Sequence, residues 1–201
     1  MASPDSIARR HLLAASLLAP LAGPSAGARN GQVGPGKSAR VLVACFSRTG
    51  NTLVVAGQIC RAVGGELFEI EPAAPYPLDY AQTVEQARRE TASGHRPALK
   101  AGVARMASYD TVFLGFPIWG MTAPPVIRAF LAKHDFAGKT LIPFITHGGY
   151  GAGDSQAVLA AHAPRARLRD AAFVMQDTQE KQTLERVTGW LEQVGAGKGI
   201  R

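Results

Sequence analysis

The chain has 201 residues, of which 46% are hydrophobic and 18% charged, a balance typical of one globular domain and not of a disordered chain. Its formal net charge is +7, but the basic residues are dispersed, and no aromatic residues interleave with the densest group, Arg165, Arg167 and Arg169. This pattern favours a solvated basic surface over a nucleic-acid groove. Two cysteines are too few for a disulfide framework, and five histidines without metal-ligand spacing predict no metal site. The absence of a G-x-S-x-G motif excludes the simplest serine hydrolase.

Residues 1–28 have the pattern of an export signal. Arg9 and Arg10 precede a short apolar stretch, His11–Leu21, and Ala26-Gly27-Ala28 fits the small-x-small cleavage rule. The adjacent arginines followed by His-Leu-Leu resemble a twin-arginine signal, used by proteins exported already folded; an ordinary secretory signal is the alternative. We therefore expect an exported, periplasmic protein without a membrane anchor after cleavage.

The segment after this signal matches a well-known nucleotide-binding motif, because residues 31–38 read GQVGPGKS and satisfy G-x-x-x-x-G-K-[ST]. That motif binds phosphate only between a strand and a helix, whereas here an export signal precedes it and a strand follows. We interpret residues 29–39 as a flexible linker, and residues 196–201 as a flexible tail.

The remaining chain, residues 40–195, alternates predicted strands and helices in one domain. The expected strands are 41–47, 66–70, 111–117, 140–146 and 171–176. The expected helices are 51–63, 80–92, 124–133, 154–163 and 178–193. This alternation predicts an α/β fold with a doubly wound five-stranded parallel sheet.

The first strand is followed by SRTGNT, which reads as a phosphate-binding loop. Its residues are Ser47, Arg48, Thr49, Gly50, Asn51 and Thr52. Hydroxyl and amide groups before a helix start can donate to a phosphate monoester, and the glycine lets the backbone approach. One such side chain is enough to cap a helix, and this loop offers four, which favours a ligand.

Two further loops follow strands that should end at the same sheet edge. The first contributes Pro117, Ile118, Trp119 and Gly120; the second contributes Thr146, His147, Gly148, Gly149, Tyr150 and Gly151. Trp119 reads as poorly placed for core packing and well placed to cover a flat aromatic ring, although a loop-anchoring role is credible for Trp119 or Tyr150 singly. Phosphate donors, an aromatic plate and a glycine-rich wall fit flavin mononucleotide (FMN).

Residues 40–194 resemble the flavodoxins in SRTGNT, in FPIWG and in FITHGGYGAGDS. The resemblance implies strand order 2-1-3-4-5, non-covalent FMN, and Trp119 against the isoalloxazine. His147 stands where the family often has a small hydroxylated residue, and either a contact to the flavin or loop packing explains it.

These features predict an exported, FMN-binding electron-transfer protein without an assigned catalytic residue. Its partner would be a redox protein or small electron acceptor, of acidic character because this chain is basic. An FMN-dependent NAD(P)H:quinone-type oxidoreductase, with His147, Tyr150 and Met121 lining an open pocket, is an alternative. A flavin-free binding module is another. Cys45 should lie near the end of the first strand, and Cys60 about nine residues along the following helix, about 13 Å lower at 1.5 Å per residue. This separation is too large for a disulfide and predicts two buried thiols.

Overall fold

The computed structural model describes residues 40–170, 173–176 and 183–196. The predicted export signal, linker and residues 197–201 of the predicted tail lie outside these residues. The elements are β1 (Val41–Cys45), α1 (Asn51–Val63), β2 (Glu66–Glu69), α2 (Tyr80–Ser93), the short 3₁₀ helix η1 (Met106–Ser108), β3 (Thr111–Pro117), α3 (Pro125–Lys133), β4 (Thr140–His147), α4 (Ser155–His162), β5 (Arg167–Leu168), β6 (Phe173–Gln176) and α5 (Thr183–Gln193).

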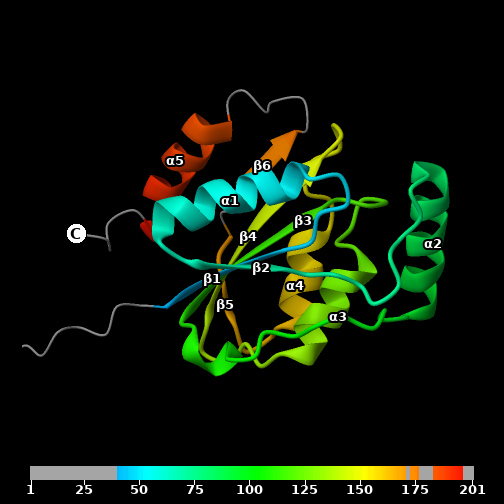
Figure 1. Cartoon of the computed structure of the whole chain (residues 1–201), viewed down its shortest axis with the longest axis horizontal. Helices are drawn as coiled ribbons and strands as arrows, with labels where there is room; N and C mark the ends of the chain where they lie inside the picture. Colours follow the sequence, from blue (N-terminus) through cyan, green and yellow to red (C-terminus); the bar gives the residue numbers. More distant parts are fainter. Residues whose placement is uncertain (1–39, 171–172, 177–182, 197–201) are drawn as a thin grey trace, which may run out of the picture. The chain divides into compact units, whose positions relative to one another are not determined.

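The strands form a parallel sheet in the order β2-β1-β3-β4-β5, which confirms the predicted order and fold class (Figure 1). The fifth position is divided between two short strands. β5 pairs with Thr140 and Leu141 at the start of β4, and β6 pairs with residues 144–147 at its end. The single strand predicted over 171–176 therefore corresponds in part to β6, with residues 171–172 outside the described part. β5 was missed because two residues carry no periodic signal.

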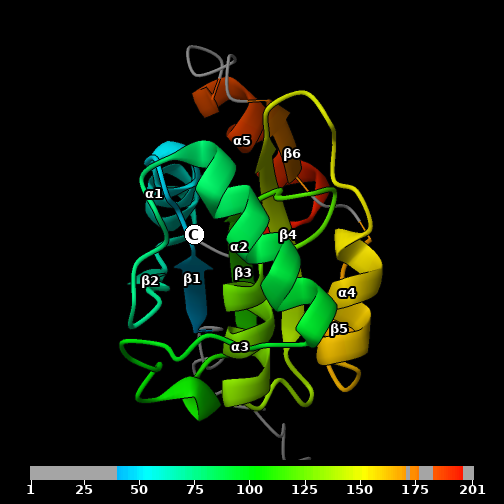
Figure 2. The same ribbon diagram turned by 90° about the vertical axis from the view of Figure 1, so that its right-hand side faces the viewer.

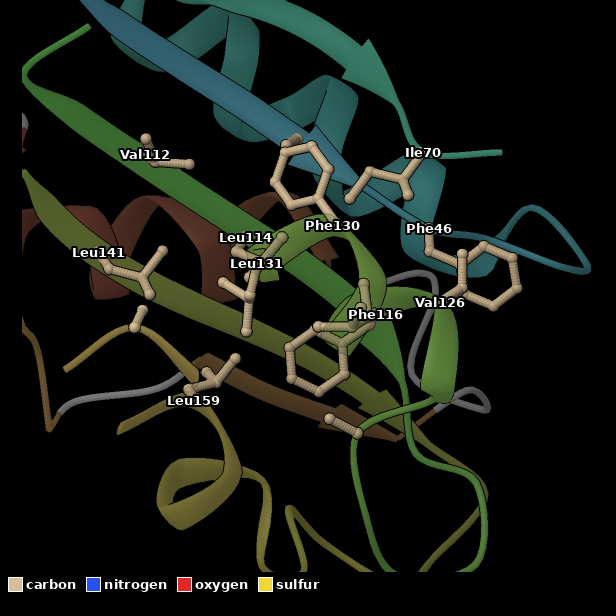
Figure 3. Packing of buried hydrophobic residues seen from close by; sticks show 14 of the residues in the cluster. Phe46, Ile70, Val112, Leu114, Phe116, Val126, Phe130, Leu131, Leu141 and Leu159 are labelled. Carbon is tan, nitrogen blue, oxygen red and sulfur yellow. The ribbon is translucent and has the colours of Figure 1, made fainter. Parts of the chain in front are cut away.

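Helices cover both faces of this sheet, as a doubly wound fold requires (Figure 1). Successive side chains of a strand point to opposite faces, so Leu42 and Ala44 enter the core that includes α3 and α4, whereas Val43 and Cys45 enter the core beneath α1 and α5. Figure 3 shows part of the core on the α3 and α4 side. Both faces of the central strands are buried, which explains why they read as continuous apolar runs.

Most element bounds follow the sequence prediction to within one residue. Helix α1 and strand β3 match it, whereas β1 ends at Cys45, two residues before the predicted end. Helix α5 is described from Thr183 onward, and residues 178–182 of its predicted start lie outside the described part. The sequence therefore places the loops correctly along the chain.

Helix α2 lies beyond the carboxyl ends of the strands (Figures 1 and 2). Its two connecting segments run antiparallel: Ala73 N donates to Ala98 O at 2.7 Å, and Lys100 N donates to Glu71 O at 2.9 Å. Asp79 caps the helix start by accepting a hydrogen bond from Gln82 N. This excursion of residues 71–100 brings α2 to the edge where the predicted binding loops meet.

Candidate functional site

A pocket of about 500 Å³ lies at the carboxyl edge of the sheet, within the size range of small-molecule sites. It is lined by Arg48, Thr49, Asn51, Thr52, Tyr80, Pro117, Ile118, Trp119, Thr146, His147, Gly148 and Tyr150. The three predicted loops therefore converge on one cavity. Ser47, Gly50, Gly120, Gly149 and Gly151 belong to these loops without lining it.

The start of α1 is left open towards this pocket. Gly50 occupies the N-cap position with φ +95°, and no side chain caps the helix. Val54 N is the first amide with a backbone partner, Gly50 O at 2.9 Å, so the preceding amides of residues 51–53 have no acceptor among the described residues. Free amides and the helix dipole favour an anion here.

The side chains of the β1–α1 loop divide into two groups. Thr49 and Asn51 are exposed and line the pocket, so their polar groups are available to a ligand. Ser47 instead accepts a hydrogen bond from Gly50 N at 3.1 Å and supports the loop from within. Two side chains and the helix amides are therefore the phosphate donors that this structure offers most directly.

Thr52 has a structural partner that the sequence did not reveal. Its buried hydroxyl lies 2.8 Å from the Thr146 hydroxyl, at the end of β4. One of the two oxygens donates to the other, so the pair ties α1 to the neighbouring loop. One of the two hydroxyl protons is therefore committed to a contact within the protein, and only the other remains available to a phosphate.

Arg48 connects the β1–α1 loop with the α2 excursion. Its Nη1 donates to Leu78 O at 2.9 Å, and its guanidinium lies 5.8 Å from the centre of the Tyr80 ring. Tyr80 is 59% exposed and lines the pocket, a role that sequence reasoning missed. Only the folded excursion brings Tyr80 to this edge; an aromatic residue at the start of a polar helix was the available signal.

Trp119 is packed in the core, so the expectation that it is poorly placed for core packing is wrong. The side chain is 5% exposed, and its ring lies edge-on to Phe46 at 5.2 Å and to Tyr76 at 4.8 Å between centroids. Burial and a hydrogen bond to Glu90 raise the pKa of Tyr76. Trp119 anchors the β3–α3 loop and presents only a small part of its surface to the pocket.

The turn after Trp119 is fixed by the next loop. Gly120 and Met121 both have positive φ, and Trp119 and Thr122 exchange backbone hydrogen bonds across them. Asp154 N donates to Met121 O at 3.0 Å. A side chain on Gly153 would collide with the Met121 backbone, so this glycine is needed for the close approach.

The β4–α4 loop supplies a second rim. His147 Nδ1 accepts a hydrogen bond from Gly149 N at 2.9 Å, which gives this imidazole a role in loop packing while it lines the pocket. Tyr150 is 71% exposed and also lines the pocket. Of the two aromatic residues expected at the site, Tyr150 has the freer ring.

A larger cavity, about 710 Å³, lies beside η1 and the end of α3, away from the three loops. Two of its polar side chains are bonded to nearby backbone: Lys139 Nζ donates to Tyr109 O, and His134 Nε2 accepts from Val103 N. Burial and the neighbouring Lys133 lower the pKa of His134. Size alone therefore does not identify the site; the convergence of the three loops does.

Both cysteines are free thiols, and Cys60 is half-buried, whereas the sequence predicted two buried thiols. Burial raises the pKa of Cys45 to about 12, so this thiol is protonated and unreactive. Within the described ranges, no three His, Cys, Asp or Glu side chains gather as metal ligands. No helix in this part of the chain is long and apolar enough to cross a membrane.

Comparison with known proteins gives consistent results. The flavodoxin family model matches residues 40–194. A candidate flavoprotein from Bacteroides eggerthii is 34% identical, with TM-score 0.68, over 78% of this chain and 98% of its own. One from Bacteroides uniformis is 33% identical, with TM-score 0.65, over 76% and 99%. A flavoprotein in complex with FMN from Lactobacillus acidophilus is 18% identical, with TM-score 0.59, over 73% and 99%.

No curated protein matches the sequence significantly. The solved structures share the fold, and two of them exceed 30% identity over nearly their whole length. Together with the family match over residues 40–194, the sheet order and the three loops at its carboxyl edge, they show that this chain belongs to the flavodoxin family and has a flavodoxin-like flavoprotein fold.

Proposed function

We propose that this chain is an exported, FMN-binding electron-transfer protein. The observation that carries the proposal is the pocket in which an uncapped helix start and three loops meet. Membership of the flavodoxin family and the FMN complex of a structural neighbour support this cofactor. Bound FMN supplies one- or two-electron transfer; the protein supplies its position and electrostatic surroundings.

The residues at the pocket fit the two ends of FMN. The free amides of α1, with Thr49 and Asn51, provide donors for a phosphate group. Tyr150 provides an exposed aromatic ring for the flavin, and Tyr80 lines the same pocket from α2. Trp119 is buried and supports the β3–α3 loop, whereas Tyr150 is exposed. In this proposal Tyr150 therefore takes the stacking role that the resemblance assigned to Trp119.

Reconstitution with FMN tests the proposal. The purified protein, freed of small molecules, is titrated with FMN and with riboflavin, which lacks the phosphate, by calorimetry and visible absorption. We expect 1:1 binding of FMN and much weaker binding of riboflavin. A colourless protein that binds neither compound would refute the function and would favour the flavin-free binding module.

Thr49→Ala locates the phosphate within the pocket. Loss of a hydrogen bond to a charged group should weaken FMN binding by about 10- to 100-fold and leave riboflavin binding unchanged. Thr188→Ala, an exposed threonine on α5, is the matched control. Equal loss for both ligands would place the phosphate elsewhere.

An FMN-dependent NAD(P)H:quinone-type oxidoreductase is the second candidate, favoured by the open, solvent-accessible rim around Tyr150. His147 and Tyr150 line the pocket as this alternative requires, whereas Met121 does not. Steady-state oxidation of NADH or NADPH with a quinone separates the two candidates. Turnover without any added reductase would favour the enzyme.

The basic character of the chain favours an acidic partner. Stopped-flow oxidation of the chemically reduced protein by ferricyanide and by hexaamminecobalt(III) tests this preference. We expect the rate with the anionic oxidant to fall as salt is added, and the rate with the cationic oxidant to rise. The opposite salt dependence would contradict an acidic partner.

Export to the periplasm, with twin-arginine transport as its route, is tested by changing the arginine pair. Arg9→Lys combined with Arg10→Lys should leave the uncleaved precursor in the cytoplasm, as measured by fractionation and immunoblotting. Arg40→Lys, at the start of the folded domain, is the control. Unchanged export of the double variant would indicate the general secretory route.

A further inference from the structure

A third cavity, of about 390 Å³, lies between α2 and the turn that follows β3. It is lined by Val84, Ala87, Arg88, Thr91, Ala92, Trp119, Gly120 and Thr122. Trp119 is the one lining residue that this cavity shares with the pocket formed by the three loops, so this residue lies between the two. Small-molecule sites begin at about 300 Å³, so this cavity can take a one- or two-ring compound.

The wall on α2 is built by one face of an otherwise polar helix. Val84, Ala87, Arg88 and Thr91 are spaced i, i+3, i+4 and i+7, which places them on the same side. Arg88 is the single charged residue of the lining, and its guanidinium makes two 2.9 Å hydrogen bonds to Glu85. Because that charge is already compensated, the cavity favours a neutral ligand.

Two hydroxyl groups give this apolar cavity hydrogen-bond donors. Thr122 Oγ1 accepts a hydrogen bond from Arg128 Nη2 at 3.0 Å, so its own proton is left available for another acceptor. Neither the Thr122 hydroxyl nor the Thr91 hydroxyl has an acceptor among the described residues. A ligand with carbonyl oxygens would satisfy them.

We propose that this cavity, lined by Thr91, Trp119 and Thr122, binds a neutral, planar ligand of the quinone class. The apolar face of α2 contacts the ring, and the Thr122 and Thr91 hydroxyls donate to its carbonyl oxygens. The inference goes beyond the proposed function and stands apart from it, because the cavity shares only Trp119 with the FMN pocket.

The test is equilibrium dialysis of the purified protein, with and without saturating FMN, against duroquinone. Its ring has no free position for attack by the Cys60 thiol. Thr91→Phe fills the cavity and should weaken duroquinone binding at least about tenfold. Arg89→Phe adds the same ring to an exposed position of α2 outside the lining and should change binding less than about twofold.

Thr122→Val separates hydrogen bonding from shape. It should weaken duroquinone binding by about three- to tenfold, yet leave binding of durene, the same ring without carbonyl oxygens, within about twofold. Circular dichroism of each variant verifies folding. Equal binding of duroquinone to wild type, Thr91→Phe and Thr122→Val would overturn the proposal. Displacement of duroquinone by FMN would also overturn it, because the quinone would then occupy the pocket formed by the three loops. Failure to bind FMN would refute the proposed function alone.

Discussion

The β1–α1 loop (residues 46–50) and the β3–α3 loop (residues 118–124) leave the same edge of the sheet. They differ in how far the residues expected to bind the ligand are exposed. In the β1–α1 loop, Thr49 is exposed and the first amides of α1 have no acceptor among the described residues. In the β3–α3 loop, Trp119 is buried against Phe46 and Tyr76. The order of the strands therefore brings both loops to one site, and the packing of each side chain decides whether a ligand can reach it.

Trp119→Ala should have the largest effect on this comparison. Removing a buried indole from the core should lower the free energy of unfolding by about 3–5 kcal/mol, measured by urea denaturation. A change below about 1 kcal/mol, with FMN affinity strongly reduced, would restore Trp119 to the ligand-facing role first expected from the sequence.

Gly153→Ala tests whether the β3–α3 loop is held by the loop after β4. The added methyl group meets the Met121 backbone, and the alanine must adopt φ +54°. We therefore expect the free energy of unfolding to fall by about 2–3 kcal/mol. Gly120→Ala is the control, because its φ is also positive but the space around it is open; it should cost about 1 kcal/mol. Equal losses would mean that the contact between the loops does not hold the turn.

Thr52→Val examines a buried side chain of SRTGNT that bonds to a hydroxyl group on β4. An unpaired Thr146 hydroxyl should lower the unfolding free energy by about 1–3 kcal/mol, whereas the double variant Thr52→Val with Thr146→Val should recover much of that loss. Additive losses would show that the two hydroxyls are not coupled.

Tyr150→Ala should have the smallest effect on stability, within about 0.5 kcal/mol, because the ring is 71% exposed. If Tyr150 covers the flavin, the same variant weakens FMN binding by about three- to tenfold. Thermal denaturation and FMN titration on one preparation measure both. Unchanged affinity for FMN would show that Tyr150 does not cover the flavin and would favour Tyr80 as the aromatic residue that does.

Much of the fold could be predicted from local patterns. The run Thr111–Pro117 is apolar because β3 is buried on both faces, and the helix at Asn51–Val63 ends at Gly64, which has positive φ. β5 could not be predicted, since its two residues are defined only by pairing with β4. The α-helices and the longer strands, which have local sequence patterns, were found, whereas β5 and the three-residue helix η1 were not.

For the site, the sequence by itself determined that three loops with phosphate donors, aromatic residues and glycines follow three parallel strands, because their order along the chain implies a shared sheet edge. Tertiary structure decided what each side chain does there. It buried Trp119 in the core, paired Thr52 with Thr146, and brought Tyr80 from the start of α2 to the pocket. These outcomes depend on contacts between segments that are distant along the chain, and a local sequence pattern does not specify such contacts.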